Sequence, residues 1–127
     1  MLDLDHFKNV NDTYGHIVGD KVLINFAFLV QKFMRKEDTL IRYGGEEFLV
    51  LLPGANSNAV KIVGEKIRRV IEETSVKHGD QDIKVTVSIG GVSSPEFQCD
   101  DFEQLVNNAD QNLYQAKDTG RNKVVAN

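Results

Sequence analysis

Three carboxylates and a pair of glycines are placed where they could do chemistry together. Asp3 lies in an N-terminal segment that alternates apolar and acidic residues, and Glu46 and Glu47 directly follow Gly44-Gly45. Clustered carboxylate oxygens suit Mg²⁺ or Mn²⁺, which commonly share the phosphates of a substrate. Glycines would let a large ligand approach the backbone closely. If the two segments are neighbours in one sheet, they predict a metal-phosphate site; the alternative is a solvated acidic hairpin with an ordinary turn.

Hydrophobic periodicity predicts the elements that must position these residues. The alternation over 1–5 predicts a strand with Asp3 and Asp5 on one side. Two β-rich runs around the glycine pair predict a hairpin. Asp5 and Asp12 are interpreted as caps and turn formers. We expect strands over 1–5, 39–43, 48–52, 83–92 and 124–125, helices over 18–36, 59–71 and 101–119, and a turn over 11–16.

The order of these elements indicates the fold class. A strand, a helix, a hairpin, a helix, a strand, a helix and a last short strand follow one another along the chain. Because a hairpin interrupts the alternation, we expect a mixed α/β fold of the α+β kind, with a largely antiparallel central sheet flanked by helices. A doubly wound parallel sheet is not expected. The 127 residues have the length of one domain, 1–127.

Composition and charge exclude several classes of protein. The apolar fraction is 41% and the charged fraction 27%, as in folded globular proteins. The formal net charge of −4 argues against nonspecific binding of DNA or RNA, but allows a small anionic ligand held by a few cations. No apolar run approaches the roughly 20 residues of a membrane span. The one cysteine, Cys99, cannot pair within the chain, which favours a reducing, cytoplasmic setting.

Five linked segments resemble the GGDEF-domain diguanylate cyclases. Residues 44–48 read G-G-E-E-F, a variant of the family's signature. Residues 3–12 resemble its D-x-D-x-F-K-x-x-N-D segment, and residues 15–20 its G-H-x-x-G-D segment. Residues 88–90 are similar to the family's later strand and residues 109–122 to its closing helix. The segments follow the family's order over essentially the whole chain, which a single short motif would not do.

The resemblance also has a gap at its start. The family normally begins earlier, with a segment around D-x-L-T-G-L-x-N-R and the first half of strand one, and this sequence lacks that segment. We therefore expect an N-terminally truncated catalytic domain without the family's usual link to a sensor domain. The resemblance implies a fold of the nucleotidyl-cyclase and polymerase-palm type.

The resemblance implies an enzyme that condenses two GTP molecules into cyclic di-GMP and releases two pyrophosphates. Each 3′-hydroxyl attacks the α-phosphorus of the other GTP, so two domains must face each other as a homodimer. Two Mg²⁺ or Mn²⁺ ions per site would be held by Asp3, the Leu4 carbonyl, Glu46 and Glu47. Lys8 would neutralise charge on the transferred phosphate. Glu46 is the candidate for helping deprotonate the 3′-hydroxyl, and its roles as base and as metal ligand both stay open.

The resemblance also implies a set of substrate-binding residues. Asn11 and Asp20 would recognise guanine, because a carboxylate accepts from its N1–H and exocyclic amine together, a pair that adenine does not offer. His16 would line the same pocket. Lys117 and Arg121 would reach the terminal phosphates. The structural alternatives are a helix N-terminal acid for Asp20 and helix C-terminal cations for the last two residues.

An R-x-x-D motif precedes the glycine pair. Arg35 and Asp38 stand at the offset at which the family carries an inhibitory site for its product. The resemblance implies that cyclic di-GMP binds there, because Arg can grip phosphate and Asp can accept from guanine. Arg42 and Lys66 would support this inhibitory site. The alternative is an ion pair at a helix end, which contributes little.

Two other functions compete with the cyclase interpretation. A non-catalytic GGDEF-type module would bind cyclic di-GMP or GTP for signalling, although such modules usually carry a degraded signature. An unrelated polymerase-palm or nucleotide-cyclase enzyme would use similar carboxylates. The cyclase interpretation implies GTP as substrate, cyclic di-GMP as product and inhibitor, and a sensor or regulatory domain in the parent protein. It also implies a cytoplasmic location, with a membrane anchor on the parent allowed, and no nucleic-acid partner.

Overall fold

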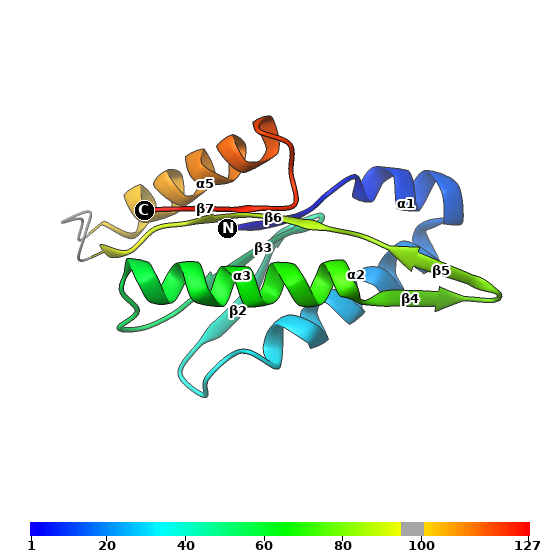
Figure 1. Cartoon of the computed structure of the whole chain (residues 1–127), viewed down its shortest axis with the longest axis horizontal. Helices are drawn as coiled ribbons and strands as arrows, with labels where there is room; N and C mark the ends of the chain where they lie inside the picture. The colour runs from blue at the N-terminus through cyan, green and yellow to red at the C-terminus, as the bar shows by residue number, and fades with distance from the viewer. Residues whose placement is uncertain (95–100) are drawn as a thin grey trace.

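Figure 1 shows a computed structural model of the chain, which describes residues 1–94 and 101–127. Cys99 lies outside the described residues. A five-stranded sheet has the strand order β2-β3-β1-β6-β7. Its strands are β1 (Leu2–Leu4), β2 (Thr39–Gly44), β3 (Glu47–Leu51), β6 (Val87–Gly91) and β7 (Val124–Ala126).

The pairing of these strands confirms the predicted class of sheet. β1 is the central strand and pairs antiparallel with β3 and with β6. β2 pairs antiparallel with β3, whereas β7 runs parallel to β6. Leu2 and Leu4 point to one face of the central strand and Asp3 to the other, and all three residues are buried because helices cover the sheet on either side. The fold is therefore the expected α+β arrangement with a largely antiparallel sheet.

Helices lie on both faces of the sheet (Figure 1). α5 (Phe102–Asp118) packs on one face of β6 and β7, and α3 (Ser57–Glu73) packs on the other. Gly90 permits the close approach of α5, because a Cβ there would lie 2.1 Å from the carbonyl oxygen of Ala109. None of the described helices is both long and apolar enough to cross a membrane.

The main core lies between the sheet and the helices α2 (His16–Gln31) and α3. Phe26 of α2 stacks at 47° on Phe48 of β3, with ring centroids 4.8 Å apart. Ile67 of α3 and Val30 of α2 are almost fully buried. Burying each such side chain contributes about 1.5–3 kcal/mol, so this core fixes α2 against the sheet.

The predicted turn over residues 11–16 is wrong. These residues belong to α1 (Phe7–Tyr14), the connecting Gly15 and the first residue of α2. Phe7 and Val10 are both buried, three residues apart, and face the core. Asp12 and Thr13, two of the polar residues that indicated a turn, are exposed on the outer side of this short helix. Gly15 alone turns the chain, with φ at 87°.

The predicted strand over residues 83–92 is two strands. β4 (Ser75–His78) and β5 (Gln81–Lys84) form a separate hairpin, and β6 begins at Val87. The break lies at Thr86, whose carbonyl accepts from the amide of Asp5 at 2.9 Å. The chain leaves one hairpin there and joins β1, a change of partner that alternation of side chains does not reveal.

Two further boundaries differ from expectation. The first long helix ends at Gln31, five residues before the expected end at Lys36. The hairpin turn consists of Gly45 and Glu46, because Gly44 is the last residue of β2 and pairs with Glu47. The expected helices over 59–71 and 101–119 are confirmed as α3 and α5.

Candidate active site

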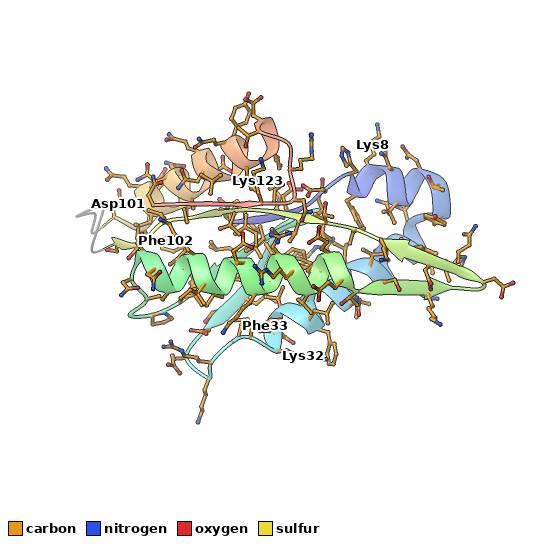
Figure 2. The ribbon with its side chains drawn as sticks, viewed as in Figure 1. Lys8, Lys32, Phe33, Asp101, Phe102 and Lys123 are labelled. Atoms are coloured by element: carbon orange, nitrogen blue, oxygen red, sulfur yellow. The ribbon has the colours of Figure 1, made fainter. Side chains whose placement is uncertain are left out.

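A cleft of about 410 Å³ lies between α1, α2 and the β2–β3 hairpin. Among its lining residues are five that the sequence assigned to catalysis or substrate binding: Lys8, Asn11, His16, Asp20 and Glu46. Phe7 and Leu23 form its apolar wall, a role that their core-like spacing did not reveal. Figure 2 shows Lys8 at the surface of α1. The cleft thus combines cationic, anionic and amide groups on one apolar floor.

Helical spacing explains how α1 and α2 present these groups. Lys8 and Asn11 are three residues apart on α1, and His16 and Asp20 are four apart on α2, so each pair shares a helix face. Gly19 lets the two helices meet, because a Cβ there would lie 1.9 Å from Oδ1 of Asn11. The Asn11 side chain is therefore held against α2 beside the cleft.

The hairpin closes the cleft from the other side. Glu46 projects into the cleft from the two-residue turn, and a Cβ on Gly44 or Gly45 would have no atom within 4 Å. Arg42 also lines the cleft, and its Nε donates to the carbonyl of Gly45 at 2.9 Å. The structure thus places Arg42 beside the predicted substrate residues. Its membership of the inhibitory site stays a prediction.

A second cluster lies at the end of the central strand. Asp3 and Glu47 are direct cross-strand neighbours, and the Leu4 amide donates to the carbonyl of Glu46 at 3.3 Å. The Lys117 ammonium donates to Oδ2 of Asp3 at 2.6 Å. The structure therefore places three of the predicted metal ligands, Asp3, Leu4 and Glu47, next to one another, and the predicted phosphate-binding Lys117 contacts Asp3 directly. Glu46 links this cluster to the cleft.

Electrostatics couple the carboxylates of this cluster. Burial raises the pKa of Asp3 above its ordinary value, and the hydrogen bond from Lys117 opposes this shift. The negative charges of Glu46 and Glu47 also raise the pKa of Asp3. A cation beside Asp3 would stabilise its ionised form.

The chemistry of these donors fits a hard divalent cation. Asp3, Glu46 and Glu47 supply carboxylate oxygens, and Leu4 supplies a backbone carbonyl. Within residues 1–94 and 101–127, no three acidic, histidine or cysteine side chains are already arranged around a metal position. In the arrangement described here Asp3 is instead neutralised by Lys117.

Asp5 and Asp12 do not act as the expected caps and turn formers. The N-cap of α1 is His6, whose side chain makes no capping hydrogen bond. Asp12 is an exposed residue in the middle of α1. Asp5 is buried and accepts hydrogen bonds from Thr86, Ser88 and the backbone amide of Asn122. It is a buried link between β1, β6 and the turn before β7.

The R-x-x-D motif lies in the irregular segment after α2. Oδ2 of Asp38 accepts from the backbone amide of Arg35 at 2.6 Å. The guanidinium of Arg35 lies 3.9 Å from the carboxylate of Glu37, and both side chains are largely exposed. Asp38 thus closes a turn and does not form the alternative ion pair with Arg35. Lys66 is exposed on α3.

Comparison with known proteins identifies relatives of this chain. Residues 1–123 match the family described as "Diguanylate cyclase, GGDEF domain". Diguanylate cyclase A of Treponema denticola is 46% identical over 124 residues, which cover 98% of this chain. The chain spans only 33% of the length of that relative.

Solved structures of GGDEF domains are also similar to this chain. The GGDEF domain of DgcB from Caulobacter crescentus, in complex with c-di-GMP, superposes with a TM-score of 0.88 at 32% identity, over 98% of this chain and 73% of that one. The active GGEEF domain of a diguanylate cyclase from Vibrio cholerae superposes with a TM-score of 0.87 at 30% identity, over 98% of this chain and 78% of that one. Both similarities extend over the elements that form the cleft.

Proposed function

The chain belongs to the family of GGDEF-domain diguanylate cyclases, and on that premise we propose that it condenses two GTP molecules into cyclic di-GMP and releases two pyrophosphates. One observation carries the proposal above the others. Five side chains from three separate elements converge on one cleft: Lys8, Asn11, His16, Asp20 and Glu46. This set combines groups for a purine base, a phosphate chain and a proton transfer.

Asn11 and Asp20 recognise guanine in this proposal. The Asp20 carboxylate accepts from N1–H and the exocyclic amine, and the Asn11 amide supplies a further donor and acceptor. Both residues line the cleft, and Gly19 lets Asn11 lie against α2. His16, at the start of α2, lines the same cleft. Adenine would leave the carboxylate without a matching pair of donors, so GTP is preferred over ATP.

Three cations bind the phosphates. Lys8 lies in the cleft and neutralises the charge that develops on the transferred phosphate. Lys117 contacts Asp3 of the acidic cluster, and Arg121 lies four residues later, in the turn after α5. Both residues bind the terminal phosphates. Binding a triphosphate would give Lys117 a second anionic partner besides Asp3.

Asp3, the Leu4 carbonyl, Glu46 and Glu47 would hold Mg²⁺ or Mn²⁺, with two ions in each site. Such ions stabilise charge on the attacking and leaving oxygens. The residues of the chain orient the nucleotide around this position. Glu46 lines the cleft and takes the proton of the 3′-hydroxyl. The hydroxyl oxygen then attacks the α-phosphorus, and pyrophosphate leaves.

The reaction needs a second copy of the domain. Each site binds one GTP, and the 3′-hydroxyl of one must reach the α-phosphorus of the other, so two clefts face each other. The parent protein supplies a sensor or regulatory domain that brings the copies together, in the cytoplasm. Cyclic di-GMP inhibits by binding at Arg35 and Asp38, with Arg42 and Lys66 in support.

Product analysis by mass spectrometry tests this function. The domain is incubated with GTP and Mg²⁺, with ATP in a parallel reaction. We expect cyclic di-GMP from GTP alone, and none from the double variant Glu46→Gln, Glu47→Gln. The matched control is Asp80→Asn, Asp82→Asn, which removes two exposed carboxylates from the β4–β5 hairpin, outside the cleft.

The competing function makes a different prediction in the same assay. A non-catalytic binding module would form no cyclic di-GMP, even as a forced dimer that carries the family's N-terminal segment, and would bind cyclic di-GMP tightly. That pair of results would replace the cyclase proposal.

A further inference from the structure

The turn between α5 and β7 has an unusual backbone. Three consecutive residues have positive φ: Gly120 at 116°, Arg121 at 63° and Asn122 at 47°. The amide of Arg121 donates to the carbonyl of Ala116 at 2.9 Å, which ends the helix in a Schellman-type turn. Arginine has no intrinsic preference for this backbone region, so contacts elsewhere must hold the turn.

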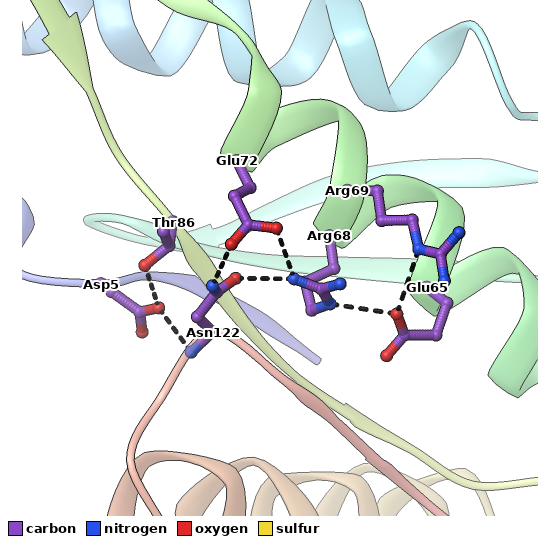
Figure 3. A network of polar contacts seen from close by, with 7 residues as sticks. All are labelled: Asp5, Glu65, Arg68, Arg69, Glu72, Thr86 and Asn122. Atoms are coloured by element: carbon purple, nitrogen blue, oxygen red, sulfur yellow. Dashed lines mark hydrogen bonds and ion pairs between the residues drawn. The ribbon is translucent and has the colours of Figure 1, made fainter.

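Asn122 supplies those contacts (Figure 3). Its side-chain amide donates to Oε1 of Glu72 at 2.7 Å, and its side-chain oxygen accepts from Nη1 of Arg68 at 3.0 Å. Arg68 also binds the carboxylates of Glu72 and Glu65. The Asn122 hydrogen bond and the charge of Arg68 hold the pKa of Glu72 below its usual range. The turn is therefore fastened to α3 by both ends of one amide.

The backbone of the turn is fastened to the central strand. The amide of Asn122 donates to Oδ2 of Asp5 at 3.0 Å, and that oxygen also accepts from the Thr86 hydroxyl at 2.7 Å. Asp5 is two residues from Asp3, which Lys117 contacts directly. The turn thus lies beside the acidic cluster, and Arg121 is carried on it between two fixed points, Lys117 and Asn122.

We propose that Asn122 is a positioning residue that directs Arg121 to the phosphates of the bound nucleotide. The inference rests on the proposed function, because it takes GTP as the ligand of Arg121. Asn122 does not touch the nucleotide; it sets the backbone direction of Arg121 through Asp5, Glu72 and Arg68. Loss of Asn122 therefore weakens recognition of the terminal phosphates and leaves recognition of guanine intact.

Binding of two nucleotides tests the inference without turnover. The probes are 3′-deoxy-GTP, which lacks the attacking hydroxyl, and GMP, which lacks the terminal phosphates; Kd is measured by calorimetry in Mg²⁺. In Asn122→Gly, which tolerates positive φ and keeps the amide to Asp5, we expect 3′-deoxy-GTP to bind about tenfold more weakly, since one well-placed charged contact is lost. GMP binding stays within about twofold of the unchanged protein.

A double-mutant cycle shows whether Asn122 acts through Arg121. In an Arg121→Ala background, Asn122→Gly should have no further effect on 3′-deoxy-GTP. Glu72→Ala, on the exposed end of α3, gives a second variant that removes the acceptor outside the turn and should weaken 3′-deoxy-GTP in the same way. Glu73→Ala, the neighbouring exposed glutamate, is the matched control and should change neither Kd.

Each of three results would overturn the positioning role of Asn122 and leave the proposed function standing. The first is equal weakening of the binding of both nucleotides, and the second is an effect of Asn122→Gly that persists in the Arg121→Ala background. Unchanged binding in both Asn122→Gly and Glu72→Ala would do the same. If the protein without substitutions binds neither nucleotide, the proposed function itself fails, and the positioning role fails with it. Failure of the proposed function is thus seen without any variant, whereas failure of the positioning role alone is seen only in the variants.

Discussion

We propose that Asp20 carries the selection of guanine. It lies on the first turns of α2, lines the cleft and is exposed, so its carboxylate remains available for a ligand. An acid of the first helical turn was the structural alternative for this residue. Its place opposite Glu46, across the same cleft, favours the ligand-binding interpretation.

Replacing this carboxylate should weaken GTP binding. In Asp20→Asn one acceptor becomes a donor that faces the donors of guanine, and we expect Kd for 3′-deoxy-GTP to rise about tenfold to a hundredfold. Asp12→Asn is the matched control, because Asp12 is exposed on α1 and is not among the residues that line the cleft. Equal effects of the two substitutions would contradict the role of Asp20.

The amino group of Met1 makes stability depend on pH when it is the first residue of the preparation. It donates to the carbonyl of Gly90 at 2.8 Å. Burial lowers its pKa from 8.0 to about 6, and the charge of Asp110 opposes the shift. Because the unfolded chain binds the proton more tightly, stability is full above pH 8 and falls as the pH drops from 8 to 6.

Urea unfolding at several pH values checks this expectation. The free energy of unfolding should fall by up to about 2–3 kcal/mol between pH 8 and pH 6, since each unit of pKa shift corresponds to about 1.36 kcal/mol. Acetylating the amino group removes the charge and should abolish this part of the pH dependence. An unchanged slope after acetylation would show that other groups titrate in this range.

Glycines decide how closely the elements approach one another. At Gly90 an added Cβ would lie 2.1 Å and 2.2 Å from backbone atoms of Ala109 and Leu113 on α5. Backbone atoms of a packed helix cannot move aside as a side chain can. The contact between α5 and β6 also positions Lys117, so it links packing to the site.

Gly90→Ala should therefore be strongly destabilising. We expect a loss of about 1–3 kcal/mol or more in the free energy of unfolding, measured with urea. Gly44→Ala is the comparison, because a Cβ there meets no atom within 4 Å, and its stability should change by less than about 0.5 kcal/mol. Similar losses in both variants would contradict the close packing of α5 on β6.

The contact between α1 and α2 gives a second prediction at this scale. Gly19→Ala would displace the Asn11 side chain, whose Oδ1 would lie 1.9 Å from the new Cβ. We expect weaker binding of 3′-deoxy-GTP in this variant, and little further loss when Gly19→Ala is added to Asn11→Ala. Additive losses would show that Gly19 acts independently of Asn11.

The elements themselves were largely predictable, and the failures have physical causes. α3 and α5 are long and strongly periodic, so their sequence patterns were sufficient. α1 was missed because its polar outer face contains residues typical of turns. The split between β5 and β6 arises because the chain pairs with β4 up to Lys84, and Thr86 then bonds Asp5 at the end of β1, a tertiary event with no local signal.

The candidate site was also only partly predictable from the sequence. The residues of α1, α2 and the hairpin that the resemblance singled out line one cleft, because they lie on short segments with fixed spacing, and their roles stay predictions. It did not reveal the Asp3–Lys117 contact or the Asp5–Asn122 link. These join residues more than a hundred positions apart in the sequence, which only the completed fold brings together.

At the scale of the whole molecule, the account requires two copies. In the proposed function one cleft binds one GTP, whereas the reaction joins two nucleotides. A domain that is separate in dilute solution should therefore turn over slowly, and joining two copies should restore activity without changing any residue of the cleft.

The most direct test is the rate of cyclic di-GMP formation as a function of protein concentration. If two clefts must face each other, the rate per domain rises in proportion to protein concentration while the domain is dilute, and two copies joined by a flexible linker lose this dependence. A constant rate per domain in the dilute, unlinked protein would contradict the requirement for two facing clefts. No cyclic di-GMP from either the concentrated domain or the linked pair would contradict the cyclase function itself.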